Sequence, residues 1–248
     1  MQRDSKRILA ADLQGVFDPT RFSIARSPAQ VGRLPHYDGP ILPSCLDMLI
    51  KMPLGEIRLP KSYRGIEAIE HFVRETTKSH ALYKPRWNES CYLYLTVDNR
   101  NVKEGKTHRN RGWHFDGMQG RRYPDKLPVC HQYVASTCLP AEYYVGNDID
   151  LVDMSEDENW FSEIDRQIPD NAPVVQFADH DIVLMSAYQA HRSVPAKEEV
   201  PRLFLRLDIS HKRQDRLGNT ENPDLMPPWP MVERHFEKHE PVCDTGWE

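Results

Sequence analysis

The spacing of hydrophobic positions along this 248-residue chain changes near residue 90. Before that point, apolar residues recur every three to four positions in residues 43–52 and 64–82, which predicts a helix in each segment. The stripe of the second helix consists of Ile66, Ile69, Phe72 and Val73. Residues 1–40 are punctuated by proline and glycine, and we expect irregular structure there with one short strand or helix at 7–17.

Beyond residue 90 the apolar runs shorten and become rich in β-branched and aromatic residues, which is typical of strands. We expect strands at 91–97, 129–139, 142–145, 174–177, 182–186 and 202–210. A short helix is expected at 158–168, and a terminal helix at 231–238. Helices followed by a series of short strands favour a mainly β protein, a sandwich or barrel buttressed by N-terminal helices.

No internal repeat or change in composition calls for a second domain. We therefore expect a single domain over residues 1–248, with a helical and irregular buttress at 1–89, a β core at 90–210 and a C-terminal extension at 211–248. The sequence has no glycine-rich phosphate loop and no GxSxG turn, which leaves nucleotide hydrolysis and serine hydrolase chemistry without support.

Composition narrows the setting of the protein. The formal net charge of −5 argues against polyanion binding by the surface as a whole. Five cysteines without a CxxC spacing indicate neither a disulfide framework nor a zinc ribbon, so a reducing cytoplasm is the simplest location. The N-terminal segment lacks a signal-peptide core, and no apolar run is long enough to span a bilayer. We expect a soluble cytoplasmic protein with no membrane partner.

The most informative stretch is residues 112–117, which read Gly-Trp-His-Phe-Asp-Gly. In an extended segment, His114 and Asp116 point to the same side of the strand. A second imidazole, from His191 after a later apolar strand, would complete a set that holds Fe(II) and leaves coordination positions open. The alternative for a single histidine is a hydrogen-bonded place in the core. A second His-x-Asp, at 36–38, lies between prolines and predicts a turn.

The last strand carries two arginines, Arg202 and Arg206, which alternate with leucines at 203, 205 and 207. Period-two alternation places the leucines on one face and the arginines on the other. If the arginines face solvent, this is an ordinary half-exposed strand. If the leucines instead pack under the N-terminal helices, the arginines point into the barrel, where a buried guanidinium needs an anionic partner such as a carboxylate.

The His114-x-Asp116 pair, the distal His191 and an arginine eleven residues after it resemble the Fe(II)- and 2-oxoglutarate-dependent dioxygenases over about residues 90–210. The resemblance implies a double-stranded β-helix (jelly-roll, cupin-like) core. It also implies that His114, Asp116 and His191 bind Fe(II) and that Arg202 holds the distal carboxylate of 2-oxoglutarate. The implied reaction uses O2 to hydroxylate an unactivated C–H bond, with release of succinate and CO2. The pair Arg202 and Arg206 looks like that of the taurine and sulfate-ester branch, where the second arginine can face substrate.

The segment around the His-x-Asp pair is basic, with eight basic residues against three acidic ones between 100 and 126. The basic residues are Arg100, Lys103, Lys106, Arg109, Arg111, Arg121, Arg122 and Lys126. Such a segment can create a local positive field at a pocket, although a solvated loop is an equally good interpretation. We expect a small or medium, anionic substrate, and the candidate substrate contacts are Arg206, Arg121, Arg122 and Trp113.

Two other functions remain open at this point. A nucleic-acid-modifying oxygenase of the same type would bind DNA or RNA through the basic segment, in a salt-sensitive manner. A cupin-type metalloenzyme would use the same fold without 2-oxoglutarate, and in a jelly-roll binding module the histidines would be structural.

Overall fold

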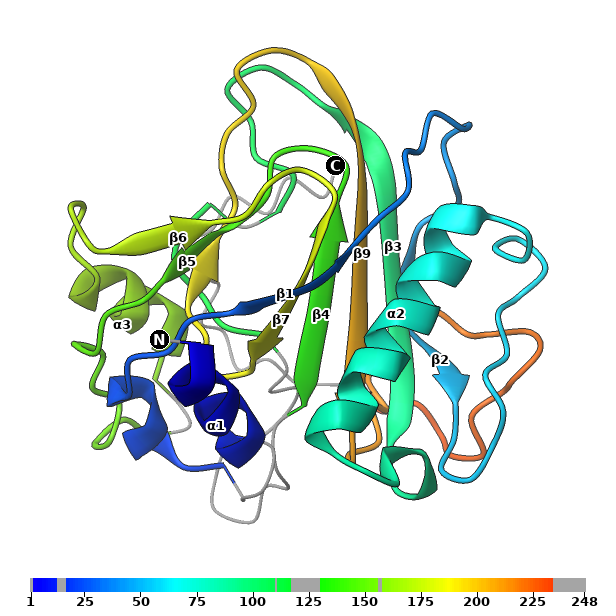
Figure 1. The fold of residues 1–248 in the computed structure, drawn as a ribbon, viewed down its shortest axis with the longest axis horizontal. Helices are drawn as coiled ribbons and strands as arrows, with labels where there is room; N and C mark the ends of the chain where they lie inside the picture. Colours follow the sequence, from blue (N-terminus) through cyan, green and yellow to red (C-terminus); the bar gives the residue numbers. More distant parts are fainter. Residues whose placement is uncertain (1, 13–16, 110, 117–129, 156–157, 234–248) are drawn as a thin grey trace.

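The computed structural model describes residues 2–12, 17–109, 111–116, 130–155 and 158–233. Two antiparallel sheets form the body of the protein, and helices lie on both sides of it (Figure 1). The strands are β1 (Ala29–Arg33), β2 (Cys45–Lys51), β3 (Tyr92–Val102), β4 (His131–Ser136), β5 (Glu142–Tyr144), β6 (Val174–Gln176), β7 (Asp181–Ser186), β8 (His191–Arg192) and β9 (Val200–Ser210). The α-helices are α1 (Gln2–Asp12), α2 (Glu67–Tyr83) and α3 (Trp160–Gln167), and 3-10 turns lie at Pro19–Ser23 and Trp87–Glu89.

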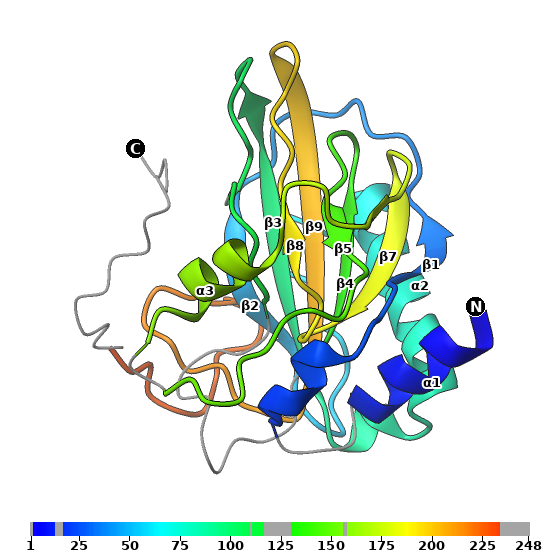
Figure 2. The same ribbon diagram turned by 90° about the vertical axis from the view of Figure 1, so that its left-hand side faces the viewer.

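The order of the strands confirms the predicted fold class. The larger sheet runs β1-β7-β4-β9-β3-β2, and the smaller one runs β6-β5-β8. The chain passes from β3 through a bridge that pairs His114 with His191, back to β4, across to β5 and β6, and then alternates through β7, β8 and β9. Figure 2 shows β5 and β8 in front of the larger sheet. Two facing antiparallel sheets wound alternately by one chain make a jelly roll, or double-stranded β-helix.

Helix α2 lies against the outer face of the larger sheet (Figure 1). Leu203, Leu205 and Leu207 of β9 are at most 1% exposed and belong to one core cluster with Ile69 and Phe72 of α2. The leucines therefore pack under a helix, as one of the two sequence-based alternatives requires. Consequently the opposite face of β9, with its arginines, points into the space between the two sheets.

One predicted helix was wrong, because residues 43–52 contain strand β2, which pairs with β3 at the edge of the larger sheet. Most of β2 is buried, and a short buried strand has no clean apolar–polar alternation. In addition, the pairing register shifts between Cys45 and Met48, and Asp47 adopts a left-handed backbone conformation with φ of 46°. This bulge changes the apolar spacing to one that resembles a helix.

The N-terminal 89 residues therefore contribute two sheet strands, β1 and β2, beside helices α1 and α2, and are more than a helical buttress. The expected element at 7–17 is the helix α1, which begins earlier in the chain. The expected terminal helix at 231–238 lies mainly outside the described residues. In the described part of the chain, no helix combines the length and apolar character that crossing a membrane requires.

Candidate metal centre

The sheet bridge at the mouth of the barrel brings His114 and His191 together, although they are far apart in the sequence. Their backbones exchange two hydrogen bonds, of 3.0 and 2.9 Å, and their ring centroids lie 4.4 Å apart. Asp116, two residues along the same extended segment, completes a group whose nitrogen and carboxylate atoms all lie within 4.8 Å of one another. Among the residues that the structure describes, this is the one such group of three.

The tautomers of both histidines suit metal binding. Nδ1 of His114 donates to the Gly112 carbonyl at 2.9 Å, and Nδ1 of His191 donates to the Gln189 carbonyl at 3.0 Å. A carbonyl only accepts, so Nδ1 carries the proton and Nε2 keeps its lone pair in each neutral ring. Burial, reinforced by the neighbouring His191, lowers the pKa of His114 to about 4. This ring is therefore in its neutral, ligating form at physiological pH.

Asp116 supplies the carboxylate of the group. Its Oδ2 lies 3.7 Å from Nε2 of His191 and accepts a hydrogen bond of 2.7 Å from Nη1 of Arg206. Burial acts to raise the pKa of Asp116, but the positive charge of Arg206 opposes it, and that pKa lies well below its usual value. Two imidazoles that offer Nε2 and one ionised carboxylate are a donor set that fits a divalent transition metal and leaves further coordination positions open.

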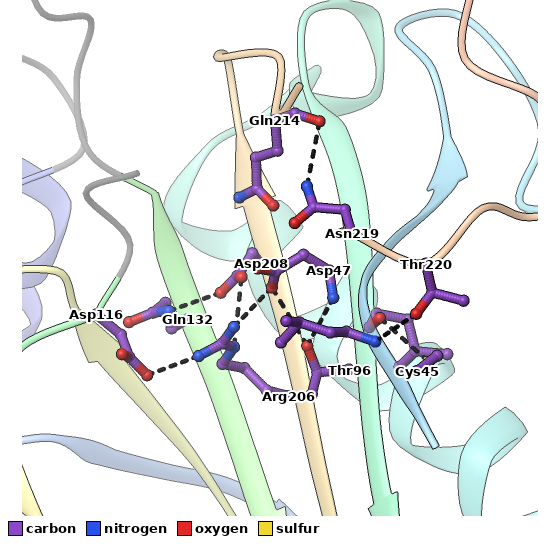
Figure 3. A network of polar contacts seen from close by, with 12 residues as sticks. Cys45, Asp47, Thr96, Asp116, Gln132, Arg206, Asp208, Gln214, Asn219 and Thr220 are labelled. Carbon is purple, nitrogen blue, oxygen red and sulfur yellow. Dashed lines mark hydrogen bonds and ion pairs between the residues drawn. The ribbon is translucent and has the colours of Figure 1, made fainter. Parts of the chain in front are cut away.

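Arg206 is surrounded by carboxylates inside the barrel (Figure 3). Its Nη2 donates to Asp47 at 2.6 Å, and its Nε lies 3.4 Å from Asp208. Asp208 also accepts a hydrogen bond of 2.7 Å from Gln132, and burial raises its pKa to about 7. Arg206 itself is 5% exposed. The charge of Arg206 is engaged by three carboxylates, one of which is Asp116, and the substrate contact that we expected from the sequence stays a prediction.

Arg202 lies on the same face of β9 and is 4% exposed, but its partners are uncharged. Its Nε donates to the Cys138 carbonyl at 2.9 Å, its Nη2 donates to the Leu139 carbonyl at 3.1 Å, and its Nη1 lies 2.8 Å from Nδ1 of His108. Burial lowers its pKa to about 10. Within the described residues it forms no ion pair with a carboxylate, so it is a buried cation in a position to attract an anion.

The remaining predicted substrate contacts are placed as follows. Trp113 is buried, at 3% exposure, with its ring packed against Tyr144 and under the guanidinium of Arg192, 4.5 Å from the ring centroid. Arg121 and Arg122 lie outside the described residues. The other His-x-Asp, at 36–38, is in a loop, as expected, and is not part of the metal-facing group.

Two contributors to the site are not evident from the sequence. Asp47 lies in a segment with helical spacing, which gives no indication that its carboxylate reaches Arg206. His108 lies in a loop without periodicity, yet it links Arg202 to Asp98, whose Oδ2 lies 3.0 Å from Nε2 of His108. The two arginines of β9 are the signal that could have indicated these partners, because a buried arginine requires hydrogen-bond acceptors or carboxylates nearby.

Comparison with known proteins yields no matching protein-family model and no matching curated protein. Solved structures that align include EvdO2 from Micromonospora carbonacea var. aurantiaca complexed with 2-oxoglutarate (14% identity, 72% of this chain and 76% of that chain, TM-score 0.37). AviO1 from Streptomyces viridochromogenes Tue57 aligns at 16% identity over 84% of each chain, with a TM-score of 0.36. EvdMO1 aligns at 16% identity over 58% of this chain, with a TM-score of 0.33, and the match spans about a third (32%) of its length.

Proposed function

We propose that this protein is an Fe(II)- and 2-oxoglutarate-dependent oxygenase that hydroxylates an unactivated C–H bond of a small or medium-sized molecule. The observation that carries the proposal is that two imidazoles and one carboxylate, from His114, Asp116 and His191, bring their ligand atoms within 4.8 Å of one another in a jelly roll, with Nδ1 of each histidine held by a backbone carbonyl. A face of this composition leaves positions for a co-substrate and for oxygen.

In this proposal each residue has a defined task. His114, Asp116 and His191 hold Fe(II), and the Gly112 and Gln189 carbonyls orient the two imidazoles. Arg202 holds the distal carboxylate of 2-oxoglutarate. When bound, Fe(II) and 2-oxoglutarate supply the oxidising chemistry, in which substrate, O2 and 2-oxoglutarate yield hydroxylated substrate, succinate and CO2. Arg206 keeps Asp116 ionised and oriented.

The test is an anaerobic titration of the metal-free protein with Fe(II) and then with 2-oxoglutarate, followed by absorption spectroscopy and equilibrium dialysis. The wild type should bind one Fe(II), and 2-oxoglutarate only after iron. His114→Ala and Asp116→Ala should each lose Fe(II) affinity by more than tenfold while keeping the wild-type circular dichroism spectrum. His36→Ala, which changes a histidine outside the metal-facing group, is the matched control and should bind as wild type. Equal binding by His114→Ala would refute the proposal.

The contacts of Arg202 favour one competing function, a cupin-type metalloenzyme that does not use 2-oxoglutarate. Three of its N–H groups already have partners in Cys138, Leu139 and His108. If those contacts are its only task, Arg202→Ala leaves metal-dependent activity intact and the wild type shows no affinity for 2-oxoglutarate. Loss of 2-oxoglutarate binding in Arg202→Ala, with Fe(II) binding retained, would instead support the oxygenase.

A further inference from the structure

Among the described residues, the charges of three arginines act on the metal-facing group or on one another, and the three differ in what neutralises them. Arg206 has three carboxylates, and Arg202 has two carbonyls and an imidazole. The third is Arg109, from the loop before the metal-facing segment. Among the described residues, its guanidinium has no hydrogen-bond or ion-pair partner, and it lies over the ring of Phe204, 5.0 Å from the centroid.

The ring of Phe204 shows where Arg109 is. Phe204 alternates along β9 with the leucines that face α2, so it belongs to the inner face, where it packs against a cluster that includes Tyr143. The ring of Tyr143 is in turn 6.1 Å from that of His191. The guanidinium of Arg202 lies over the same Phe204 ring, 5.2 Å from its centroid. Arg109 and Arg202 are therefore two cations on one aromatic side chain, in the space beside the metal-facing group.

The electrostatic surroundings of Arg109 agree with this position. Burial lowers its pKa, the charge of Arg206 lowers it further, and Asp116 acts to raise it. Arg109 is also among the charges that lower the pKa values of His114 and Arg202. It therefore interacts with the metal-facing residues and with the proposed 2-oxoglutarate anchor.

Other basic residues of the same loop are engaged elsewhere. Arg100 pairs with Asp98 at 2.6 Å, and the exposed Arg111 donates to the Gly105 carbonyl at 3.3 Å. Two guanidinium groups contact the same ring and repel each other, and one of them lacks an acceptor among the described residues, so an anion that pairs with both would lower their electrostatic free energy. A carboxylate suits this arrangement because it can accept from two guanidinium groups at once.

We infer that Arg109 and Arg202 together bind the distal carboxylate of the 2-oxo acid co-substrate, with Arg109 supplying the free guanidinium fork. The inference rests on the proposed function in naming 2-oxoglutarate as the ligand. It adds a loop residue to an anchor that strand β9 alone was expected to provide, and it assigns the basic segment a task inside the barrel.

The experiment compares two ligands on Mn(II)-loaded protein under anaerobic conditions. One is 2-oxoglutarate, and the other is 2-oxovalerate, which keeps the 2-oxo acid end and the five-carbon chain but lacks the distal carboxylate. Dissociation constants are measured by calorimetry for the wild type, Arg109→Met, Arg109→Lys and, as a matched control from the same loop, Arg111→Met. Charge-assisted hydrogen bonds of this kind contribute roughly ten- to a hundredfold in affinity.

Arg109→Met should weaken 2-oxoglutarate binding by that factor and leave 2-oxovalerate binding unchanged, Arg109→Lys should recover part of the loss, and Arg111→Met should match the wild type. Because the substitution removes a half-buried cation that has no hydrogen-bond or ion-pair partner among the described residues, Arg109→Met without ligand should melt no lower than the wild type, which separates a binding defect from misfolding. Equal weakening of both ligands, or none, would overturn the inference while leaving the proposed function intact. Failure of the wild type to bind 2-oxoglutarate would instead refute the proposed function.

Discussion

Replacing Arg206 with methionine removes the charge that neutralises three carboxylates beside the candidate metal centre. Arg206 lies 2.6 Å from Asp47, 2.7 Å from Asp116 and 3.4 Å from Asp208, and the side chains of Arg206, Asp47 and Asp208 are 6%, 2% and 2% exposed. Removing one partner from a buried ion pair costs about 3–5 kcal/mol, because the remaining charge stays buried. We therefore expect metal-free Arg206→Met to lose about that much free energy of unfolding.

A bound divalent metal should reduce this loss. Arg206 repels a cation at Asp116, and at a separation of about 5 Å and an effective dielectric constant of about 20 the repulsion is about 3 kcal/mol per unit charge. The opposing effect, the freedom that Asp116 gains when Arg206 no longer holds it, is about 1 kcal/mol. Electrostatics therefore wins, and Mn(II) should stabilise the variant more than the wild type. Each additional 1.4 kcal/mol corresponds to tenfold tighter metal binding.

The assay is urea unfolding of both proteins with and without excess Mn(II), which supports binding without turnover. Arg26→Met is the matched control, because Arg26 is 5% exposed and lies 3.4 Å from the buried Asp12, and neither residue belongs to the metal-facing group. It should destabilise the protein equally in both conditions. The reasoning about Arg206 is refuted if its substitution costs as much with Mn(II) as without it, or more.

Three further predictions concern stability. Burial raises the pKa of Asp208 to about 7, so between about pH 4 and 7 this carboxyl ionises more readily in the unfolded chain, and the free energy of unfolding falls as pH rises. In urea titrations, the stability of Asp208→Asn relative to wild type should therefore increase with pH over this range. A constant difference would contradict the assignment. Burial lowers the pKa of His131 to about 3, so the free energy of unfolding decreases as pH falls below about 6.5, where the unfolded chain takes up a proton. His131→Asn should abolish about 1.4 kcal/mol of the decrease that the wild type shows between pH 7.5 and 5.5. An unchanged pH profile would show that His131 is protonated in the folded state. Leu205→Ala should cost about 2–5 kcal/mol by chemical denaturation, whereas Leu217→Ala, at a residue 58% exposed, should cost little; similar losses would argue against the packing of β9 under α2.

The sequence predicts those parts of the protein that depend on local periodicity. The His114-x-Asp116 spacing and the alternation of leucine and arginine in β9 both follow from the two-residue repeat of a strand, and the structure has both side-chain sets on the expected faces. The helix over 64–82 follows from its apolar stripe, and α2 confirms it.

Features that depend on a break in periodicity could not be predicted in the same way. Asp47 reaches Arg206 because the chain bulges in β2 and this residue adopts a left-handed conformation, and neither is visible as an apolar pattern. The direction of the loop that carries Arg109 and His108 depends on packing against Phe204, a contact between residues nearly a hundred positions apart. Contacts of that kind are decided by tertiary structure alone.

Strand β9 uses its two faces for two different purposes, with leucines in the core against α2 and arginines in the site. A slip of one residue in its pairing with β3 and β4 would exchange these faces, so that guanidinium groups entered the apolar core and leucines entered the barrel. Such a molecule would lose the packing of the leucines against α2 and the contact of Arg206 with Asp116 at the same time. Substitutions that loosen the register of this strand should therefore reduce the free energy of unfolding and displace Arg206 from Asp116 together.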